Sequence, residues 1–129
     1  MAIGRYSMTV LDCPDPIALA CFYGAITGWS INERRTWRDE SGIIGWTELS
    51  SDEGAALGFE LVDDYCPPTW PEGDVPQQAH LDFEVADLNI AEGEVLEIGA
   101  TKSDFQPGAD LRVFFDPAGH PFCLVKGDE

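Results

Sequence analysis

The sequence has few basic residues. Among its 129 residues, seven are Lys or Arg and 24 are Asp or Glu, which gives a formal net charge of −17. A protein that binds nucleic acid needs a basic surface to neutralise phosphates, so this balance excludes nucleic acid as a partner. The acidic residues are dispersed along the chain. They act either as a solubilising surface or as a field that attracts a cationic ligand.

Long apolar runs are also missing, since no stretch approaches the roughly 20 residues that a membrane-spanning helix requires. The N-terminus has no basic segment followed by an apolar run, so no secretory signal is visible. We therefore expect a cytoplasmic protein that does not bind membranes. The four cysteines form no C-x-x-C pair and no zinc-knuckle spacing. We expect them to be reduced packing residues.

The clearest local pattern is a strand followed by a helix. Residues 80–87 alternate between polar and apolar side chains, which is typical of a strand with one buried face. Asp87 then stands at the N-cap position of an amphipathic helix, and Gly99 ends that helix. One face of the strand carries His80, Asp82, Glu84 and Ala86.

An earlier segment repeats this pattern. Residues 8–28 contain a strand that ends at Asp15, then a helix that begins with proline and ends at Gly28. Met8 and His80 are 72 residues apart, and so are the two capping aspartates. The sequence therefore predicts two copies of one module.

Each copy continues with further strands, so the predicted order is β-α-β-β-β. In the first copy we expect a helix at 15–27 and strands at 4–12, 29–38, 43–50 and 55–62. In the second copy we expect a strand from 78, a helix from 87 and strands at 101–106, 110–115 and 121–126. Prolines make residues 64–77 a linker. The predicted class is α+β: one domain over 1–129, with modules at 1–63 and 78–129.

These features resemble the vicinal oxygen chelate superfamily, which includes glyoxalase I, extradiol dioxygenases and bleomycin resistance proteins. The resemblance rests on residues 15–29, the strand at 80–87 and residues 116–124, and it is strongest with the glyoxalase-like domains. It covers nearly the whole chain. It implies that the two modules form a curved mixed sheet around an open cleft, and it makes a homodimer the expected assembly.

The resemblance also implies four strand positions for a metal site, at Met8, Glu60, His80 and Cys123. Two of these residues depart from the family pattern. Met8 offers only a soft thioether, which suits iron(II), manganese or magnesium poorly, and Cys123 replaces a carboxylate. We therefore predict that the standard divalent metal site is absent and that no cofactor is bound. A zinc site made from Glu60, His80 and Cys123 is the alternative.

Glu60 and His80 are the candidate catalytic residues, because a carboxylate and an imidazole in one cleft can perform acid–base chemistry. The alternatives are a solvated strand residue for Glu60 and a hydrogen-bonded core residue for His80. The aromatic candidates either pack in the core or stack against a ligand. The candidate ligand-binding residues are Trp37, Trp46, Phe59, Trp70 and Arg112.

We predict a small-molecule-binding protein similar to glyoxalases and bleomycin resistance proteins. The alternative is a glyoxalase-like lyase or isomerase. That enzyme would use Glu60 and His80 either as acid and base or as ligands of a non-standard metal site.

Overall fold

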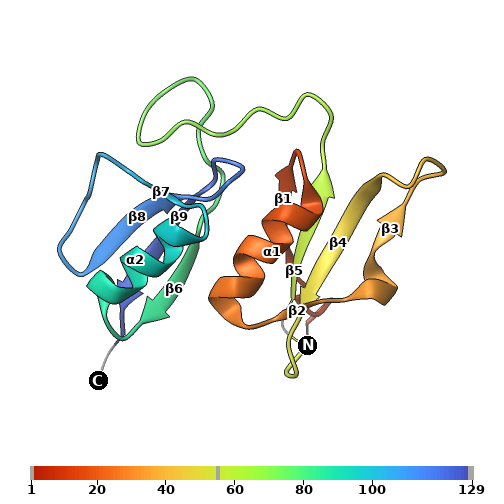
Figure 1. The fold of residues 1–129 in the computed structure, drawn as a ribbon, viewed down its shortest axis with the longest axis horizontal. Coiled ribbons are helices and arrows are strands. Elements are labelled where there is room, and N and C mark those ends of the chain that lie inside the picture. Colours follow the sequence, from red (N-terminus) through yellow and green to blue (C-terminus); the bar gives the residue numbers. More distant parts are fainter. Residues whose placement is uncertain (1, 55, 128–129) are drawn as a thin grey trace. The chain divides into compact units, whose positions relative to one another are not determined.

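The computed structural model describes residues 2–54 and 56–127. The chain divides into two compact units, Met1–Tyr65 and Cys66–Glu129. Each unit contains one α-helix and one mixed sheet in the predicted order, so the α+β class and the paired modules are confirmed (Figure 1). Among the described residues, no helix is both long and apolar enough to cross a membrane.

The helix of the first unit, α1 (Pro16–Thr27), has the predicted ends. The Asp15 carboxylate accepts a hydrogen bond of 3.1 Å from the backbone N–H of Ala18, which satisfies one of the donors left open at a helix start. Gly28 adopts the left-handed conformation at φ 77°, and its N–H donates to the carbonyl of Gly24. The cap residues therefore define both ends of α1.

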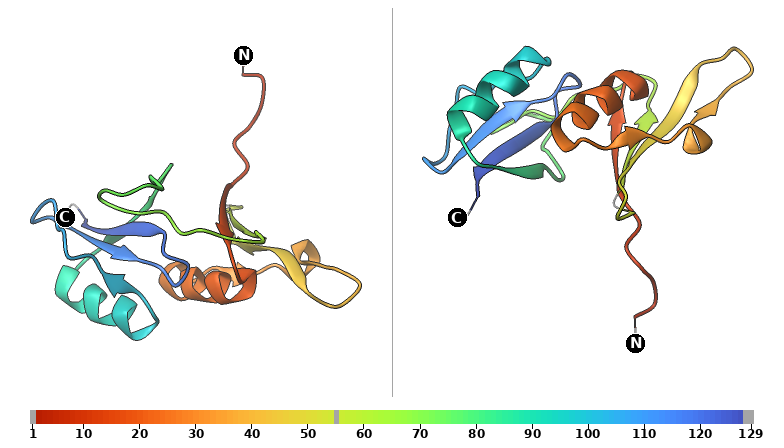
Figure 2. Two further views of the ribbon diagram at one scale, coloured as in Figure 1. Left: turned by 90° about the horizontal axis from the view of Figure 1, so that it is seen from above. Right: turned by 60° about the horizontal axis from the view of Figure 1, so that its bottom comes forward.

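The first unit has a five-stranded sheet in the order β1-β5-β4-β2, and β3 also pairs with β4. β1 runs parallel to β5, and the other pairings are antiparallel. Helix α1 lies on one side of this sheet (Figure 2), where it packs on side chains such as Leu49 and Phe59. The strands are β1 (Thr9–Cys13), β2 (Ser30–Ile31), β3 (Trp37–Arg38), β4 (Ile44–Ser50) and β5 (Ala56–Leu61).

The predicted strand at 29–38 is wrong in its middle. A 3₁₀-helix, η1 (Glu33–Arg35), separates β2 from β3. The side chain of Asn32 accepts a hydrogen bond from Arg34 N–H, and the Thr36 hydroxyl bonds the Asn32 carbonyl at 2.9 Å. These local hydrogen bonds offer the backbone an alternative to the sheet ladder. The first strand is also shorter than predicted, since it begins at Thr9.

The second unit has a four-stranded sheet in the order β6-β9-β8-β7, with β6 parallel to β9. Asp87 caps α2 by accepting a hydrogen bond from Ile90 N–H, and Gly99 follows the helix at φ 117°, as predicted. The elements are β6 (Leu81–Val85), α2 (Leu88–Glu97), β7 (Thr101–Lys102), β8 (Leu111–Phe115) and β9 (Pro121–Lys126).

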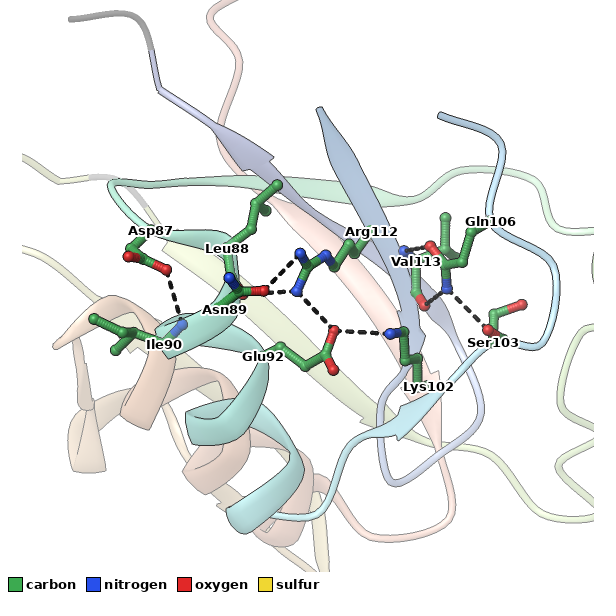
Figure 3. Close-up of polar contacts among 10 residues, drawn as sticks. All are labelled: Asp87, Leu88, Asn89, Ile90, Glu92, Lys102, Ser103, Gln106, Arg112 and Val113. Carbon is green, nitrogen blue, oxygen red and sulfur yellow. Dashed lines mark hydrogen bonds and ion pairs between the residues drawn. The ribbon is translucent and has the colours of Figure 1, made fainter. Parts of the chain in front are cut away.

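Strand β7 has two residues, whereas the sequence predicted a strand over 101–106. A side chain continues the pairing beyond it (Figure 3). The amide of Gln106 accepts a hydrogen bond of 2.9 Å from Val113 N–H and donates one of 3.0 Å to the Val113 carbonyl. Ser103 N–H also donates to that carbonyl. Gln106 therefore occupies the place of a neighbouring strand along the edge of β8.

Replacing Asp15 by Ala should lower the free energy of unfolding by about 1 kcal/mol, because the cap of α1 loses its acceptor. Asp15→Asn keeps an acceptor oxygen and serves as the matched control. Urea denaturation followed by circular dichroism measures both variants. Equal stability of Asp15→Ala and the unsubstituted chain would show that the cap contributes nothing.

Candidate functional site

Three of the predicted site residues lie in one row across the sheet of the first unit. Trp37 on β3 pairs with Trp46 on β4, and Trp46 pairs in turn with Glu60 on β5. Asp12 on β1 follows Glu60 as the next pair. Directly paired residues project from the same face of a sheet, so two indole rings and two carboxylates share one surface.

This surface is the face away from α1. Thr47 and Leu49 are buried on the α1 side, and strand alternation places their neighbour Trp46 on the other side. Trp37 is 54% exposed, and the Glu60 carboxylate makes no hydrogen bond with any described residue. Trp37 and Glu60 of this row are therefore accessible to a ligand.

A buried carboxylate orients the central indole of the row. Trp46 Nε1 donates a hydrogen bond of 2.9 Å to Glu48 Oε2, and the same oxygen lies 3.4 Å from Arg35 Nε. Glu48 is only 4% exposed, so these two donors compensate for the loss of solvent around its charge. Sequence reasoning missed Glu48. Its spacing of two residues from Trp46 on one strand was the available signal.

Gly58 provides the space in which the indole of Trp46 lies. A β-carbon at position 58 would lie 3.2 Å from Trp46 Cζ2, 3.1 Å from Val10 Cγ2 and 3.0 Å from Met8 Sδ. Met8 therefore packs on the apolar part of this face. Its sulfur contacts the sheet surface close to the indole.

The other predicted ligand-binding residues do not join the row. Phe59 is fully buried on the opposite face, where its ring stacks on Tyr23 with centroids 6.1 Å apart. Trp70 belongs to the second unit, and its ring packs on Phe105 with centroids 5.6 Å apart.

Arg112 joins β8 to the helix α2 (Figure 3). Its guanidinium donates hydrogen bonds to Asn89 Oδ1 at 2.8 Å, to Glu92 Oε1 at 3.0 Å and to the carbonyl of Leu88 at 3.3 Å. Lys102 Nζ also lies 3.0 Å from Glu92 Oε1. The hydrogen bond from Lys102 lowers the pKa of the Glu92 carboxyl. Burial opposes this shift, and the hydrogen bond from Arg112 adds to it. Arg112 therefore has a structural role in this unit.

The second unit brings together His80, Asp82 and Cys123. His80 Nε2 lies 3.3 Å from Asp82 Oδ1, and Asp82 pairs directly with Cys123 across β6 and β9. Burial, followed by the charge and the hydrogen bond of Asp82, raises the pKa of the Cys123 thiol to about 11. Sequence reasoning proposed His80 and Cys123 but missed Asp82, although strand alternation places Asp82 on the face of His80.

The four metal positions that the family resemblance implies divide between the units. Met8 and Glu60 lie in the first unit, whereas His80 and Cys123 lie in the second. The donors are a thioether, a carboxylate, an imidazole and a thiol whose pKa is about 11. Hard ions such as Mn²⁺ prefer oxygen ligands, so these residues do not fit the ion.

A cavity of about 920 Å³ lies elsewhere in the first unit, beside the segment that precedes β1. None of the predicted site residues lines it. Its lining includes Arg5, Tyr6, Trp29, Glu53 and Leu57.

The family model described as "Glyoxalase-like domain" matches residues 8–125. Comparison with curated proteins gives no match. Among solved structures, a glyoxalase family protein from Enterococcus faecalis has a TM-score of 0.67 and 20% identity, and the match covers 97% of this chain and 99% of that one. These values show a common fold.

Two further structures have the same fold. A glyoxalase/bleomycin resistance protein/dioxygenase family enzyme from Burkholderia phytofirmans has a TM-score of 0.66 and 17% identity, over 93% of this chain and 96% of that one. A mutant of the fosfomycin resistance protein FosX from Listeria monocytogenes, in complex with Mn(II) and a dihydroxypropylphosphonic acid, has a TM-score of 0.69. It is 17% identical, over 98% of this chain and 95% of that one.

Replacing Arg112 by Met should lower the free energy of unfolding by about 2 kcal/mol, since hydrogen bonds from a charged donor are lost. Arg112→Lys keeps the positive charge but lacks the planar guanidinium. Its free energy of unfolding should lie between those of Arg112→Met and the unsubstituted chain. The difference in free energy of unfolding between Arg112→Met and the unsubstituted chain should shrink at acid pH, because the ion pair is lost as Glu92 is protonated. Urea denaturation at neutral and acid pH tests this. Unchanged stability of Arg112→Met would leave the residue available for a ligand.

Cys123 should react with iodoacetamide about a hundredfold more slowly at pH 8 than a cysteine of ordinary pKa, because only the thiolate reacts. Asp82→Asn should accelerate the reaction, since it removes the negative charge beside the thiol. The exposed residues Cys21 and Cys66 are internal references. Mass spectrometry of alkylated peptides gives the rates. A Cys123 rate equal to that of Cys66 would contradict the expectation.

Proposed function

The chain belongs to the glyoxalase-like domain family, and from that premise we propose that it binds a planar organic cation on the open sheet face of its first unit. The ligand would stack on Trp37 and Trp46, and the Glu60 carboxylate would hold its positive charge. Binding would proceed without the standard divalent metal site of the family.

The observation that carries this proposal is the row Trp37–Trp46–Glu60–Asp12. Indole faces attract cations and planar groups, and carboxylates beside them complement a positive charge. The Arg35 guanidinium already lies over the ring of Trp37, 5.7 Å from its centroid, so this indole accepts a cation within the protein itself. The net charge of −17 favours the approach of the same class of ligand.

The comparisons support a small-molecule ligand without naming it. The structurally similar proteins include an enzyme of the glyoxalase/bleomycin resistance protein/dioxygenase family and a fosfomycin resistance protein in complex with Mn(II) and a dihydroxypropylphosphonic acid. The choice of a cation therefore rests on the row of this chain.

Titration with a panel of planar organic cations should quench tryptophan fluorescence, whereas neutral and anionic analogues of equal size should not. Trp46→Ala should weaken binding about tenfold, because a desolvated cation–indole contact contributes roughly 1–2 kcal/mol. Glu60→Gln should weaken binding of the cations, and added salt should weaken it further. A chelator should leave the affinity unchanged.

Trp29→Phe is the matched control, because Trp29 lies outside the row and should affect the signal without affecting affinity. If cations bind equally well to Trp46→Ala, Glu60→Gln and the unsubstituted chain, the row is not the site. If a bound compound is converted instead, and Glu60→Gln or His80→Ala abolishes conversion while leaving affinity intact, the lyase or isomerase alternative replaces this proposal.

A further inference from the structure

We propose that His80, Asp82 and Cys123 form a site for a divalent ion of the zinc class, contained entirely within the second unit. The three candidate ligand atoms lie within 4.8 Å of one another. Asp82 is not one of the four positions that the family resemblance implies. The site is also distinct from the open face of the first unit.

Strand geometry explains why these side chains converge. His80 immediately precedes β6 and Asp82 lies within it, and the 3.3 Å between His80 Nε2 and Asp82 Oδ1 shows that the two side chains lie together. Cys123 is the direct partner of Asp82 on β9, and paired residues share a face. The three residues therefore form a triangle on the side of the sheet away from α2.

The distances suit a small tetrahedral ion. Zinc binds nitrogen and oxygen ligands at about 2.0–2.1 Å, so two such ligands at a tetrahedral centre are about 3.3 Å apart. His80 Nε2 and Asp82 Oδ1 are already 3.3 Å apart. Small side-chain rotations would bring Cys123 Sγ to the longer bond of about 2.3 Å that zinc makes with sulfur.

The donor set selects the ion. An imidazole nitrogen, a carboxylate oxygen and a thiolate sulfur are the three ligand types that zinc accepts in proteins, whereas Mg²⁺ and Mn²⁺ prefer oxygen. When the ion binds, the Cys123 S–H bond breaks, its proton passes to solvent and a sulfur–metal bond forms. No change of oxidation state is involved.

The site leaves a fourth coordination position open. His80 and Asp82 side chains are 43% and 58% exposed, so solvent reaches the ion from their side. Three protein ligands with one open position are typical of zinc sites that bind a water or a ligand oxygen. The proposal therefore predicts an ion that is exchangeable and removable by a chelator.

The experiment is titration of the tag-free, reduced full chain with Co²⁺, which reports tetrahedral and thiolate ligation through its absorption spectrum. Cys21 and Cys66, which are exposed, are replaced by Ser in all samples, and Cys13 is fully buried. We expect one Co²⁺ per chain, a thiolate-to-cobalt charge-transfer band and displacement by Zn²⁺. Mn²⁺ should not displace it.

Cys123→Ser should abolish the charge-transfer band, and His80→Gln or Asp82→Asn should weaken binding by at least about a hundredfold. Glu84→Gln is the matched control for Asp82→Asn. It removes the same charge from the same strand, but the Glu84 carboxylate lies over Gly127 instead. The Glu84→Gln control should bind Co²⁺ as tightly as the background protein, which carries only the Cys21→Ser and Cys66→Ser substitutions. Circular dichroism of each variant shows whether it is folded.

Glu60→Gln distinguishes this site from one at the four positions that the family resemblance implies. The proposal predicts unchanged Co²⁺ affinity for Glu60→Gln, because Glu60 belongs to the first unit. Loss of binding in that variant would overturn it. So would absence of the charge-transfer band in the background protein, or unchanged affinity in folded His80→Gln and Asp82→Asn. None of these outcomes depends on the cation binding proposed for the first unit.

Discussion

A helix covers only one face of each sheet, and the side chains of a strand alternate between its two faces. Together these two facts determine which side chains of each sheet lie on the helix side and which lie on the uncovered face. On the α1 side, the apolar residues Leu49 and Phe59 are almost fully buried. On the other face the same two strands present Trp46 and Glu60, which are directly paired. A shift of one residue in pairing would exchange the two sets.

Much of the fold follows from short-range chemistry that can be seen in the sequence. Asp15 and Asp87 cap the two helices, and Gly28 and Gly99 adopt positive φ angles after them, as their residue types indicate. The break between β2 and β3 could not be predicted in this way. Besides the local hydrogen bonds of Asn32, it involves the Thr36 hydroxyl, which lies 2.8 Å from the Thr47 hydroxyl on β4, and that contact exists only once the sheet has formed.

The candidate sites were predictable only in part, for a related reason. Alternation alone separates Phe59 from Glu60, since neighbouring residues of a strand cannot share a face. The row from Trp37 to Glu60 needs the pairing of β3, β4 and β5, and the position of Asp82 beside Cys123 needs the register of two strands distant in sequence. The structural role of Arg112 depends on side chains of α2 that its local sequence does not reveal.

The carboxamide of Gln106 has a consequence for solubility. An exposed strand edge is a template on which another chain can add a strand, and β7 is too short to cover the whole of β8. Because Gln106 satisfies both the N–H and the carbonyl of Val113, it acts as a detached peptide group at that point. An incoming strand would first have to displace it. Gln106 thus lowers the tendency of this part of β8 to pair with a strand from another chain.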